Sequence, residues 1–259
     1  FSLTIALRNL LEARFCVFIT GMSRDVYDAL IIGGGPGGST AATYLARAGK
    51  RVLVLEKEHF PRFHIGESLL PYNQSIFEEM GVLPELEAAG FTRKYGAQFH
   101  LGNSSKNIKL TFTNGKFTRA PVAFQVERAK FDHILLEHAR KSGAEVREGW
   151  TVTRFTHEGD FVSIEARDEN GATEQFRGSF LIDASGRNNL TGNQEGLKVV
   201  DQKLKKFVIF GHFDDVKMDE GKRAGDILLI RLQKEWFWLI PLSPKKTSIG
   251  CVLDHADFT

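Results

Sequence analysis

The sequence has 259 residues, 42% hydrophobic and 25% charged, so it can bury a large core and does not have a disordered composition. Its 34 basic and 32 acidic side chains give a formal net charge of +2, with no cationic run that would follow a phosphate backbone, so we expect no nucleic-acid partner. The two cysteines, Cys16 and Cys251, lie far apart and the histidines show no metal-ligand spacing. We therefore expect no disulfide framework, no metal site and a reducing, cytoplasmic location.

Both ends of the sequence are unusual. It begins with Phe1, and charged residues interrupt the apolar stretch 1–21, which resembles neither a signal peptide nor a membrane span. We expect Met22 to be the natural start and residues 1–21 to be a non-native or disordered extension, with an amphipathic membrane-surface helix as the alternative. The sequence ends at Thr259, just after a strand-like run, and we expect a further C-terminal segment beyond it.

The stretch 27–57 predicts a strand, a glycine turn, a helix and a second strand. An apolar run over 29–32 indicates a buried parallel strand, Gly33-x-Gly35-x-x-Gly38 opens a helix that ends at Gly49, and 52–55 forms the next strand with Glu56 at its tip. This arrangement is typical of dinucleotide binding. Gly33 permits the turn, Gly35 lets the backbone approach a pyrophosphate, Gly38 allows close helix packing, and Glu56 receives a ribose hydroxyl.

The middle of the sequence predicts an interruption of this α/β winding. Alternating runs over 97–101, 108–113 and 117–124, with a turn at Asn114-Gly115, favour an antiparallel insertion. A helix follows over 128–143, with Phe131, Ile134, Leu135 and Ala139 facing inward, and then hairpin strands around 168–171. A final apolar strand ends at Asp183-x-x-Gly186, which places a carboxylate and a flexible glycine at the ligand-binding edge of the sheet.

The stretch "EWFWLIPL" predicts a strand near the end of the chain. Alternation sends Trp236, Trp238 and Ile240 to one face, and Pro241 closes the strand. From the residues alone, this strand is either ordinary core or the wall of a binding chamber.

These motifs, in this order, resemble the FAD-dependent monooxygenase and halogenase superfamily, which is built like aromatic hydroxylases. The likeness runs from about residue 26 to 253 and rests on "GGGPGGS", "VLEK", "FPRFHIGESLLP", "VERAKFD" and "LIDASGR". It implies that the glycine loop and the acid bind the ADP half of FAD, that Arg128 and Asp183 contact the cofactor, and that the loop 66–68 lies against the flavin. The cofactor-binding residues so implied are Gly33, Gly35, Pro36, Gly37, Gly38, Ser39, Glu56, Lys57, Gly66, Glu67, Ser68, Arg128, Asp183 and Gly186.

The resemblance also implies an α/β fold, with a discontinuous Rossmann-like FAD-binding domain over 22–96 and 125–190. An inserted antiparallel substrate domain would take 97–124 and 191–259 and would be incomplete at the C-terminus.

Two further segments resemble flavin-dependent halogenases. "WFWLIP", Trp236 to Pro241, matches their W-x-W-x-I-P element, and "RKYGAQF" is similar to the segment with their catalytic lysine, which falls on Lys94. The family likeness implies that a C4a-hydroperoxyflavin, formed from reduced FAD and O₂, oxidises chloride or bromide behind the tryptophan wall. Lys94 would then deliver the halogen to an electron-rich aromatic or pyrrole. Without the family, Lys94 is predicted to be a surface lysine.

Alternatives remain open at this point. An aromatic hydroxylase or a flavin-dependent saturase shares the FAD motifs but uses NAD(P)H directly, whereas halogenases take reduced flavin from a partner reductase. A non-catalytic flavoprotein fragment is the third reading, and the fragment by itself is expected to be inactive. "GES" rather than "GEA" at 66–68 is more similar to halogenases of phenols or carrier-bound pyrroles than of free tryptophan.

Overall fold

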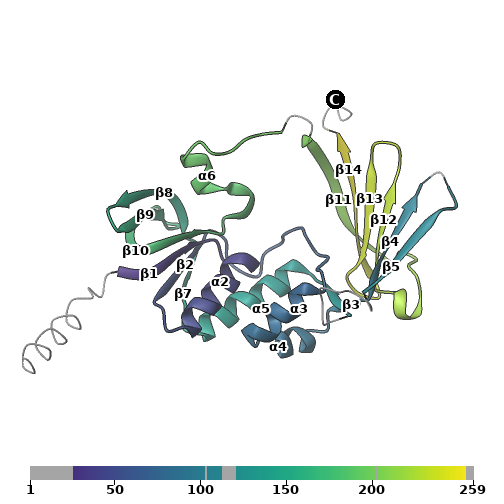
Figure 1. Cartoon of the computed structure of the whole chain (residues 1–259), viewed down its shortest axis with the longest axis horizontal. Coiled ribbons are helices and arrows are strands. Elements are labelled where there is room, and N and C mark those ends of the chain that lie inside the picture. Colours follow the sequence, from purple (N-terminus) through teal and green to yellow (C-terminus); the bar gives the residue numbers. More distant parts are fainter. Residues whose placement is uncertain (1–25, 103, 113–120, 202–203, 255–259) are drawn as a thin grey trace, which may run out of the picture.

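The computed structural model describes residues 26–102, 104–112, 121–201 and 204–254 (Figure 1). The expectations for the extension 1–21, for Met22 and for the turn at Asn114-Gly115 lie outside these residues. Within them, the strands form two six-stranded sheets and one two-stranded sheet. The two large sheets stand apart in Figure 1, with the helices α2 and α5 next to the first and α3 and α4 beyond them, toward the second.

The first sheet has the order β7-β2-β1-β10-β9-β8. The strands β1 (Val26–Ile32), β2 (Val52–Glu56), β7 (Glu145–Glu148) and β10 (Thr173–Asp183) are parallel. The apolar runs predicted β1, β2 and the end of β10, but not β7. The hairpin of β8 (Thr151–Glu158) and β9 (Phe161–Arg167) joins β10 in antiparallel pairing. Its β1, β2 and β10 therefore end together at one edge, where ligands bind in such folds.

The helices cover the first sheet with apolar side chains. The helices α2 (Pro36–Arg47) and α5 (Arg128–Lys141) contribute to a buried cluster that contains Ile31, Val54 and Leu136. The helices α3 (Tyr72–Met80) and α4 (Leu83–Ala88) pack with α5 around Phe77 and Phe131. The predicted inward positions of α5 are confirmed, since Phe131, Leu135 and Ala139 are buried and Ile134 packs against the same core.

The second sheet has the order β11-β14-β13-β12-β4-β5. Its strands are β11 (Lys206–Asp214), β14 (Lys246–Asp254), β13 (Trp236–Pro241), β12 (Ile227–Arg231), β4 (Gly96–Leu101) and β5 (Asn107–Thr111). All pairs are antiparallel except β12 with β4, which is parallel. The expectation of a purely antiparallel insertion was therefore wrong at this pair. Parallel pairing needs a long crossover, and the chain supplies one by returning to the first sheet between β5 and β11.

The strand expected over 117–124 also needs a correction. Its described end lies in β6 (Ala123–Gln125), which pairs with β3 (Thr92–Lys94) in a separate two-stranded sheet and does not join β4 and β5. These two short strands carry the chain between the large sheets. The fold class is otherwise confirmed as α/β with a second β unit, and the domain boundaries stay a prediction.

The remaining described elements are short. The helix α6 (Leu190–Gln194) and a 3₁₀ turn at Gly186–Asn188 follow β10, and a second 3₁₀ turn, Gly221–Arg223, precedes β12. Among the described residues, the helices are too short or too polar to cross a membrane.

Candidate cofactor cavity and lysine site

A cavity of about 700 Å³ opens at the carboxyl ends of β1, β2 and β10. Its size is within the usual range for cofactor sites. Nine of the residues expected to bind FAD line this cavity: Gly33, Gly35, Pro36, Gly37, Glu56, Lys57, Arg128, Asp183 and Gly186. The other five, Gly38, Ser39, Gly66, Glu67 and Ser68, are not in the lining.

The glycines of the loop before α2 have different roles. A Cβ on Gly38 would lie 1.9 Å from Gly33 O, and one on Gly33, whose φ is +98°, would lie 2.5 Å from Ala184 O. These two glycines are required by the fold itself. A Cβ on Gly35 would meet only Arg62, at 3.6 Å, and one on Gly37 would meet nothing within 4 Å. At Gly35 the protein therefore has room for a side chain, and that room opens into the cavity.

The N-terminus of α2 faces this room without a cap. Its N-cap is Gly35, which makes no side-chain capping bond, and Pro36 occupies the first turn. Unpaired N–H groups at a helix start bind anions, so the geometry suits a pyrophosphate. Ser39 is fully buried and donates a hydrogen bond to Gly34 O at 2.8 Å, so it braces the loop from behind.

The carboxylate of Glu56 holds the glycine loop from the tip of β2. Its Oε2 accepts a hydrogen bond from Gly34 N at 2.7 Å, and its Oε1 accepts one from Glu58 N at 2.9 Å. A carboxylate oxygen can accept a second bond, so this position still suits a ribose hydroxyl. That contact stays a prediction.

Asp183 caps the loop that follows β10. Its carboxylate accepts hydrogen bonds from Ser185 N at 2.9 Å and from Thr191 N and Oγ1 at 2.8 and 2.7 Å. Burial alone would raise the pKa of Asp183, but the hydrogen bonds from Ser185 and Thr191 outweigh it and hold the pKa below its usual value. The residue is thus a strand-end cap that also lines the cavity, and a direct contact with a cofactor stays a prediction.

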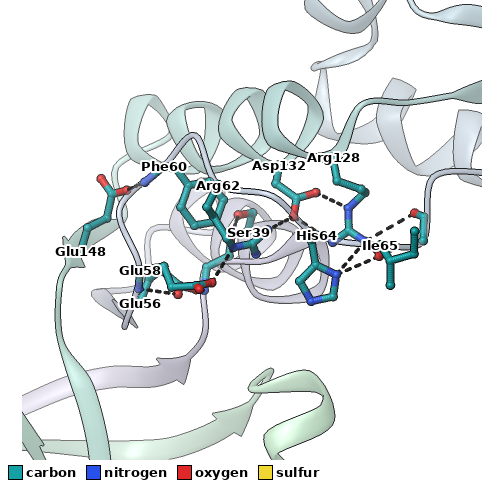
Figure 2. Close-up of polar contacts among 12 residues, drawn as sticks. Ser39, Glu56, Glu58, Phe60, Arg62, His64, Ile65, Arg128, Asp132 and Glu148 are labelled. Carbon is teal, nitrogen blue, oxygen red and sulfur yellow. Dashed lines mark hydrogen bonds and ion pairs between the residues drawn. The ribbon is translucent and has the colours of Figure 1, made fainter. Parts of the chain in front are cut away.

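Asp132 joins two arginines at the edge of the cavity, and the sequence reasoning missed it (Figure 2). Its carboxylate is fully buried and accepts bonds from Arg128 at 2.7 and 2.8 Å and from Arg62 at 2.7 Å. Both arginines line the cavity. The sequence signal was present, because Asp132 follows Arg128 by four residues on one helix.

The loop 65–68 connects this cavity to the second sheet. Arg128 Nη1 donates a hydrogen bond to Ile65 O at 2.7 Å. The side chain of Ile65 packs against the buried cluster that contains Trp238 of β13. Glu67 is buried, and its Oε1 lies 2.8 Å from His212 Nε2 on β11. Its other oxygen, Oε2, has no hydrogen-bond partner within the described part of the chain. Ser68, at the end of the loop, accepts a hydrogen bond from Lys94 on β3.

Lys94 is a buried lysine. Only 2% of it is exposed, so the reading as a surface residue is wrong. Its Nζ donates to Ser68 Oγ at 2.8 Å and lies 5.6 Å from the centre of the Phe112 ring. Burial lowers the pKa of Lys94 to about 8, against the opposing effect of the Asp226 carboxylate. A lysine with this pKa is partly a neutral amine near physiological pH, which makes it a candidate nucleophile.

The tryptophans of β13 have the predicted arrangement. Trp236 and Trp238 share a face, with ring centres 5.9 Å apart, and β13 ends at Pro241. Trp238 is 8% exposed, packs with Ile240 and donates to Ser248 Oγ at 3.2 Å, whereas Trp236 is 40% exposed. Whether they wall a reaction chamber stays a prediction.

Gly250 on β14 makes room for Trp238, and sequence reasoning did not find it. The two residues are cross-strand partners, and a Cβ on Gly250 would lie 2.1 Å from the indole. Only the strand register reveals that this glycine faces a tryptophan.

The cavity residues fit FAD. The uncapped helix, the open space at Gly35 and the acid at Glu56 suit a nucleoside diphosphate, and the adjoining loop 65–68 extends toward the lysine site. Within the described residues, no group of three His, Cys, Asp or Glu side chains is placed to hold a metal ion.

Comparison with known proteins agrees with this reading. The chain is 35% identical to 1H-pyrrole-2-carbonyl-(peptidyl-carrier protein) chlorinase of Pseudomonas fluorescens, over 92% of the chain and 58% of that protein. It is 35% identical to tryptophan 2-halogenase of Chondromyces crocatus, over 88% of the chain and 44% of that protein. The structure of the myxobacterial chondrochloren halogenase matches with a TM-score of 0.82 and 36% identity, over 90% of the chain and 54% of its own.

The chain spans about half the length of the curated relatives it matches. The part of the relatives that the chain does not cover has no bearing on the family. The family match lies within this sequence and includes the cavity, Lys94 and the tryptophan strand. The chain belongs to the FAD binding domain family, whose match runs from residue 26 to residue 256.

Proposed function

We propose that the protein is a flavin-dependent halogenase, in which Lys94 transfers an oxidised chloride or bromide to an electron-rich aromatic or pyrrole ring. The observation that carries the proposal is the buried Lys94, whose pKa is about 8 and whose Nζ bonds Ser68. Ser68 belongs to the loop 65–68, which Arg128 links to the cofactor cavity. The halogenase relatives support the same reading.

Reduced FAD, when bound, supplies the chemistry that activates O₂ and oxidises the halide to hypohalous acid. Trp238 and Ile240 are buried and apolar, which suits a wall that keeps the organic substrate away from that oxidation, while Trp236 on the same face is 40% exposed. Oxidation of the halide would then take place on one side of this wall and halogenation of the organic substrate on the other.

The environment of Lys94 allows two routes for halogen transfer. At pH 7 on the order of a tenth of the side chain is neutral amine, given a pKa of about 8. The amine attacks hypohalous acid, forms an N–halogen bond and releases water. The ring then takes the halogen, loses a proton and restores the amine. In the second route the ammonium form donates a hydrogen bond to hypohalous acid and so holds and polarises it.

The decisive experiment compares Lys94→Ala and Lys94→Arg with wild type in the full-length protein, using reduced FAD, O₂, chloride or bromide and an aromatic substrate. Both variants are expected to keep consuming O₂, and Lys94→Ala to lose halogenated product by mass spectrometry. The matched control is Lys141→Ala, because that lysine is exposed and forms a surface ion pair with Glu85. Full product formation by both Lys94 variants would remove the proposed role.

Lys94→Arg separates the two routes. A guanidinium keeps the positive charge and its hydrogen-bond donors but does not become a neutral amine at this pH. Loss of product in Lys94→Arg therefore supports the haloamine route, and retained product supports hydrogen bonding by the ammonium.

An aromatic hydroxylase or saturase is the alternative enzyme. It would consume NAD(P)H directly and form product without halide. Product formation that does not change when chloride and bromide are omitted would select this alternative. Bound FAD without turnover of reduced flavin in the protein would indicate a non-catalytic flavoprotein.

We propose a phenol or a carrier-bound pyrrole as the organic substrate, a flavin reductase as the partner and the cytoplasm as the location. The support for the substrate is Ser68 in the "GES" loop together with the pyrrole-carrier chlorinase relative. The equally identical tryptophan 2-halogenase makes free tryptophan the competing substrate. Incubation with a phenol, a pyrrolyl carrier protein and free tryptophan side by side tests this choice. Chlorinated free tryptophan as the main product would contradict it.

A further inference from the structure

We propose that Asp132 is a positioning residue that holds Arg62 and Arg128 together at the edge of the cavity, as a paired cationic clamp for a nucleoside diphosphate. In this arrangement Arg62 contacts the diphosphate. The inference rests on the proposed use of the cavity for FAD. It concerns Arg62 and Asp132, which lie in the segments "FPRFHIGESLLP" and "VERAKFD" but were given no role there.

The first ground is the geometry of the Asp132 carboxylate. It is 0% exposed, and both arginine side chains are 11% exposed. One oxygen accepts a hydrogen bond from Arg128 Nε at 2.7 Å. The other accepts hydrogen bonds from Arg128 Nη2 at 2.8 Å and from Arg62 Nη1 at 2.7 Å. One guanidinium would be enough to balance the negative charge of the Asp132 carboxylate. The second guanidinium leaves this group of three with a net positive charge beside the cavity.

The second ground is the position of Arg62 relative to the glycine loop. Its Nη2 lies 3.6 Å from the place where a Cβ on Gly35 would be. Gly35 is the residue at which the backbone leaves room for a ligand and the N-cap of the uncapped α2. Arg62 and the start of α2 therefore border the same space, and both suit the binding of a diphosphate.

The third ground is that Arg62 is fixed in place before any ligand binds. Its guanidinium lies 4.4 Å from the centre of the Phe60 ring, and Phe60 N donates to Glu148 Oε1 at 2.7 Å (Figure 2). Its Nε lies 3.1 Å from Oε2 of the half-exposed Glu58, an ion pair without hydrogen-bond geometry. A side chain held on three sides gives up little rotamer freedom when a ligand arrives, so its contribution to binding is larger.

Glu58 gives the clamp a prediction of opposite sign. It lines the cavity and pairs with Arg62, so its carboxylate competes with an anionic ligand for the guanidinium. Removing that charge in Glu58→Gln is expected to tighten diphosphate binding, whereas changes at Arg62 weaken it.

The test measures binding of ADP and of adenosine to the flavin-free protein by calorimetry, with Arg177→Gln as the control. Arg177 forms an exposed ion pair with Glu158 and is not in the cavity lining. Loss of one charge-assisted contact in Arg62→Gln is expected to weaken ADP binding about 10-fold or more. Binding of adenosine, which has no phosphate, is expected to stay unchanged. Unchanged ADP binding in Arg62→Gln would overturn the clamp.

Asp132→Asn distinguishes a positioning role of the Asp132 carboxylate from the effect of its charge. It leaves both arginines and makes the site more positive, so a purely electrostatic site would bind ADP more tightly. Loss of the shared carboxylate frees both side chains, and we expect weaker ADP binding instead. Tighter binding would overturn the positioning role. If Asp132→Asn does not fold, Arg62→Lys replaces it, because a lysine keeps the charge without the planar fork and is expected to bind ADP more weakly than wild type.

These outcomes are independent of halogenation. A full-length protein that binds ADP through Arg62 but forms no halogenated product contradicts the proposed function and leaves the clamp intact. A protein that halogenates and whose Arg62→Gln variant binds ADP normally contradicts the clamp alone.

Discussion

The cofactor cavity and the lysine site are built in different ways. The cavity is shaped largely by backbone, since glycines, an uncapped helix start and strand ends form its walls. The lysine site is assembled from side chains, since Lys94 meets Ser68 from another segment. The tryptophan strand is built in the same way, because Trp238 meets Ser248 and Gly250 across a strand pair.

The difference explains which residues tolerate change. A backbone-shaped site depends on the absence of side chains, so a single added methyl group can disrupt it. A side-chain site depends on which groups are buried together, so its properties are set by burial and by a few hydrogen bonds. The loop 65–68 takes part in both, because Arg128 bonds its start and Lys94 bonds its end.

The largest effect is expected at Gly38. A Cβ in Gly38→Ala would lie 1.9 Å from Gly33 O, so the loop must move, at a cost of about 3 kcal/mol or more in the free energy of unfolding. Gly35→Ala meets only Arg62 at 3.6 Å and is expected to change stability by less than about 1 kcal/mol. Its FAD affinity is expected to fall, because the methyl group enters the cavity. Urea unfolding and flavin titration check both variants, and equal stability of the two would contradict this division.

The second effect concerns the tryptophan strand. Gly250→Ala places a methyl group 2.1 Å from the Trp238 indole, and we expect a loss of about 2 kcal/mol in unfolding free energy with a shifted tryptophan emission. In the double variant Gly250→Ala with Trp238→Phe, the smaller ring relieves the overlap, so the two losses should be less than additive. Strictly additive losses in urea unfolding would show that the two residues do not compete for space.

The third effect is a pH dependence that arises from Lys94. Its folded-state pKa, about 8, lies below the ordinary 10.5, so the unfolded state binds more protons between these values. The contribution of Lys94 to stability therefore rises as the pH increases from about 8 to 10.5. Lys94→Met removes the buried ammonium and is expected to stabilise the protein at pH 7 by roughly 1 to 3 kcal/mol.

Urea unfolding of wild type and Lys94→Met at pH 7 and at pH 9.5 measures this dependence. The advantage of the variant should shrink at the higher pH, where folded wild type already holds a neutral amine. An advantage that is the same at both pH values would mean that the pKa of Lys94 is not lowered.

The smallest effect is expected at Ser68. Ser68→Ala removes the hydroxyl that accepts a hydrogen bond from the Lys94 ammonium. The pKa of Lys94 should therefore fall further, and the free energy of unfolding should drop by about 1 kcal/mol. The rate of Lys94 modification by an amine-reactive reagent, followed by mass spectrometry against pH, reports the pKa. The control is Ser104→Ala, since Ser104 lies in an exposed loop and bonds only its neighbourhood. An unchanged profile in Ser68→Ala would separate the loop 65–68 from the lysine.

Local patterns in the sequence were sufficient for the first βαβ unit and for part of the cavity. The spacing Gly33-x-Gly35-x-x-Gly38, the apolar strands around it and the acid at Glu56 all describe neighbours within one βαβ unit. Such features depend on backbone geometry over a few residues, which is why they can be read directly. Resemblance, in turn, was sufficient to select Lys94 and the tryptophan strand, although the residues alone favoured a surface lysine.

The tertiary structure decided everything that depends on distant segments meeting. The parallel pairing of β12 with β4, the glycine beneath Trp238 and the burial of Lys94 each join residues that no local pattern relates. The same holds for Arg62, which reaches Asp132 from 70 positions away. A pKa depends on what surrounds a group, and a clamp depends on two side chains converging on one carboxylate. Both are properties of three-dimensional packing, which the order of residues along the chain does not show.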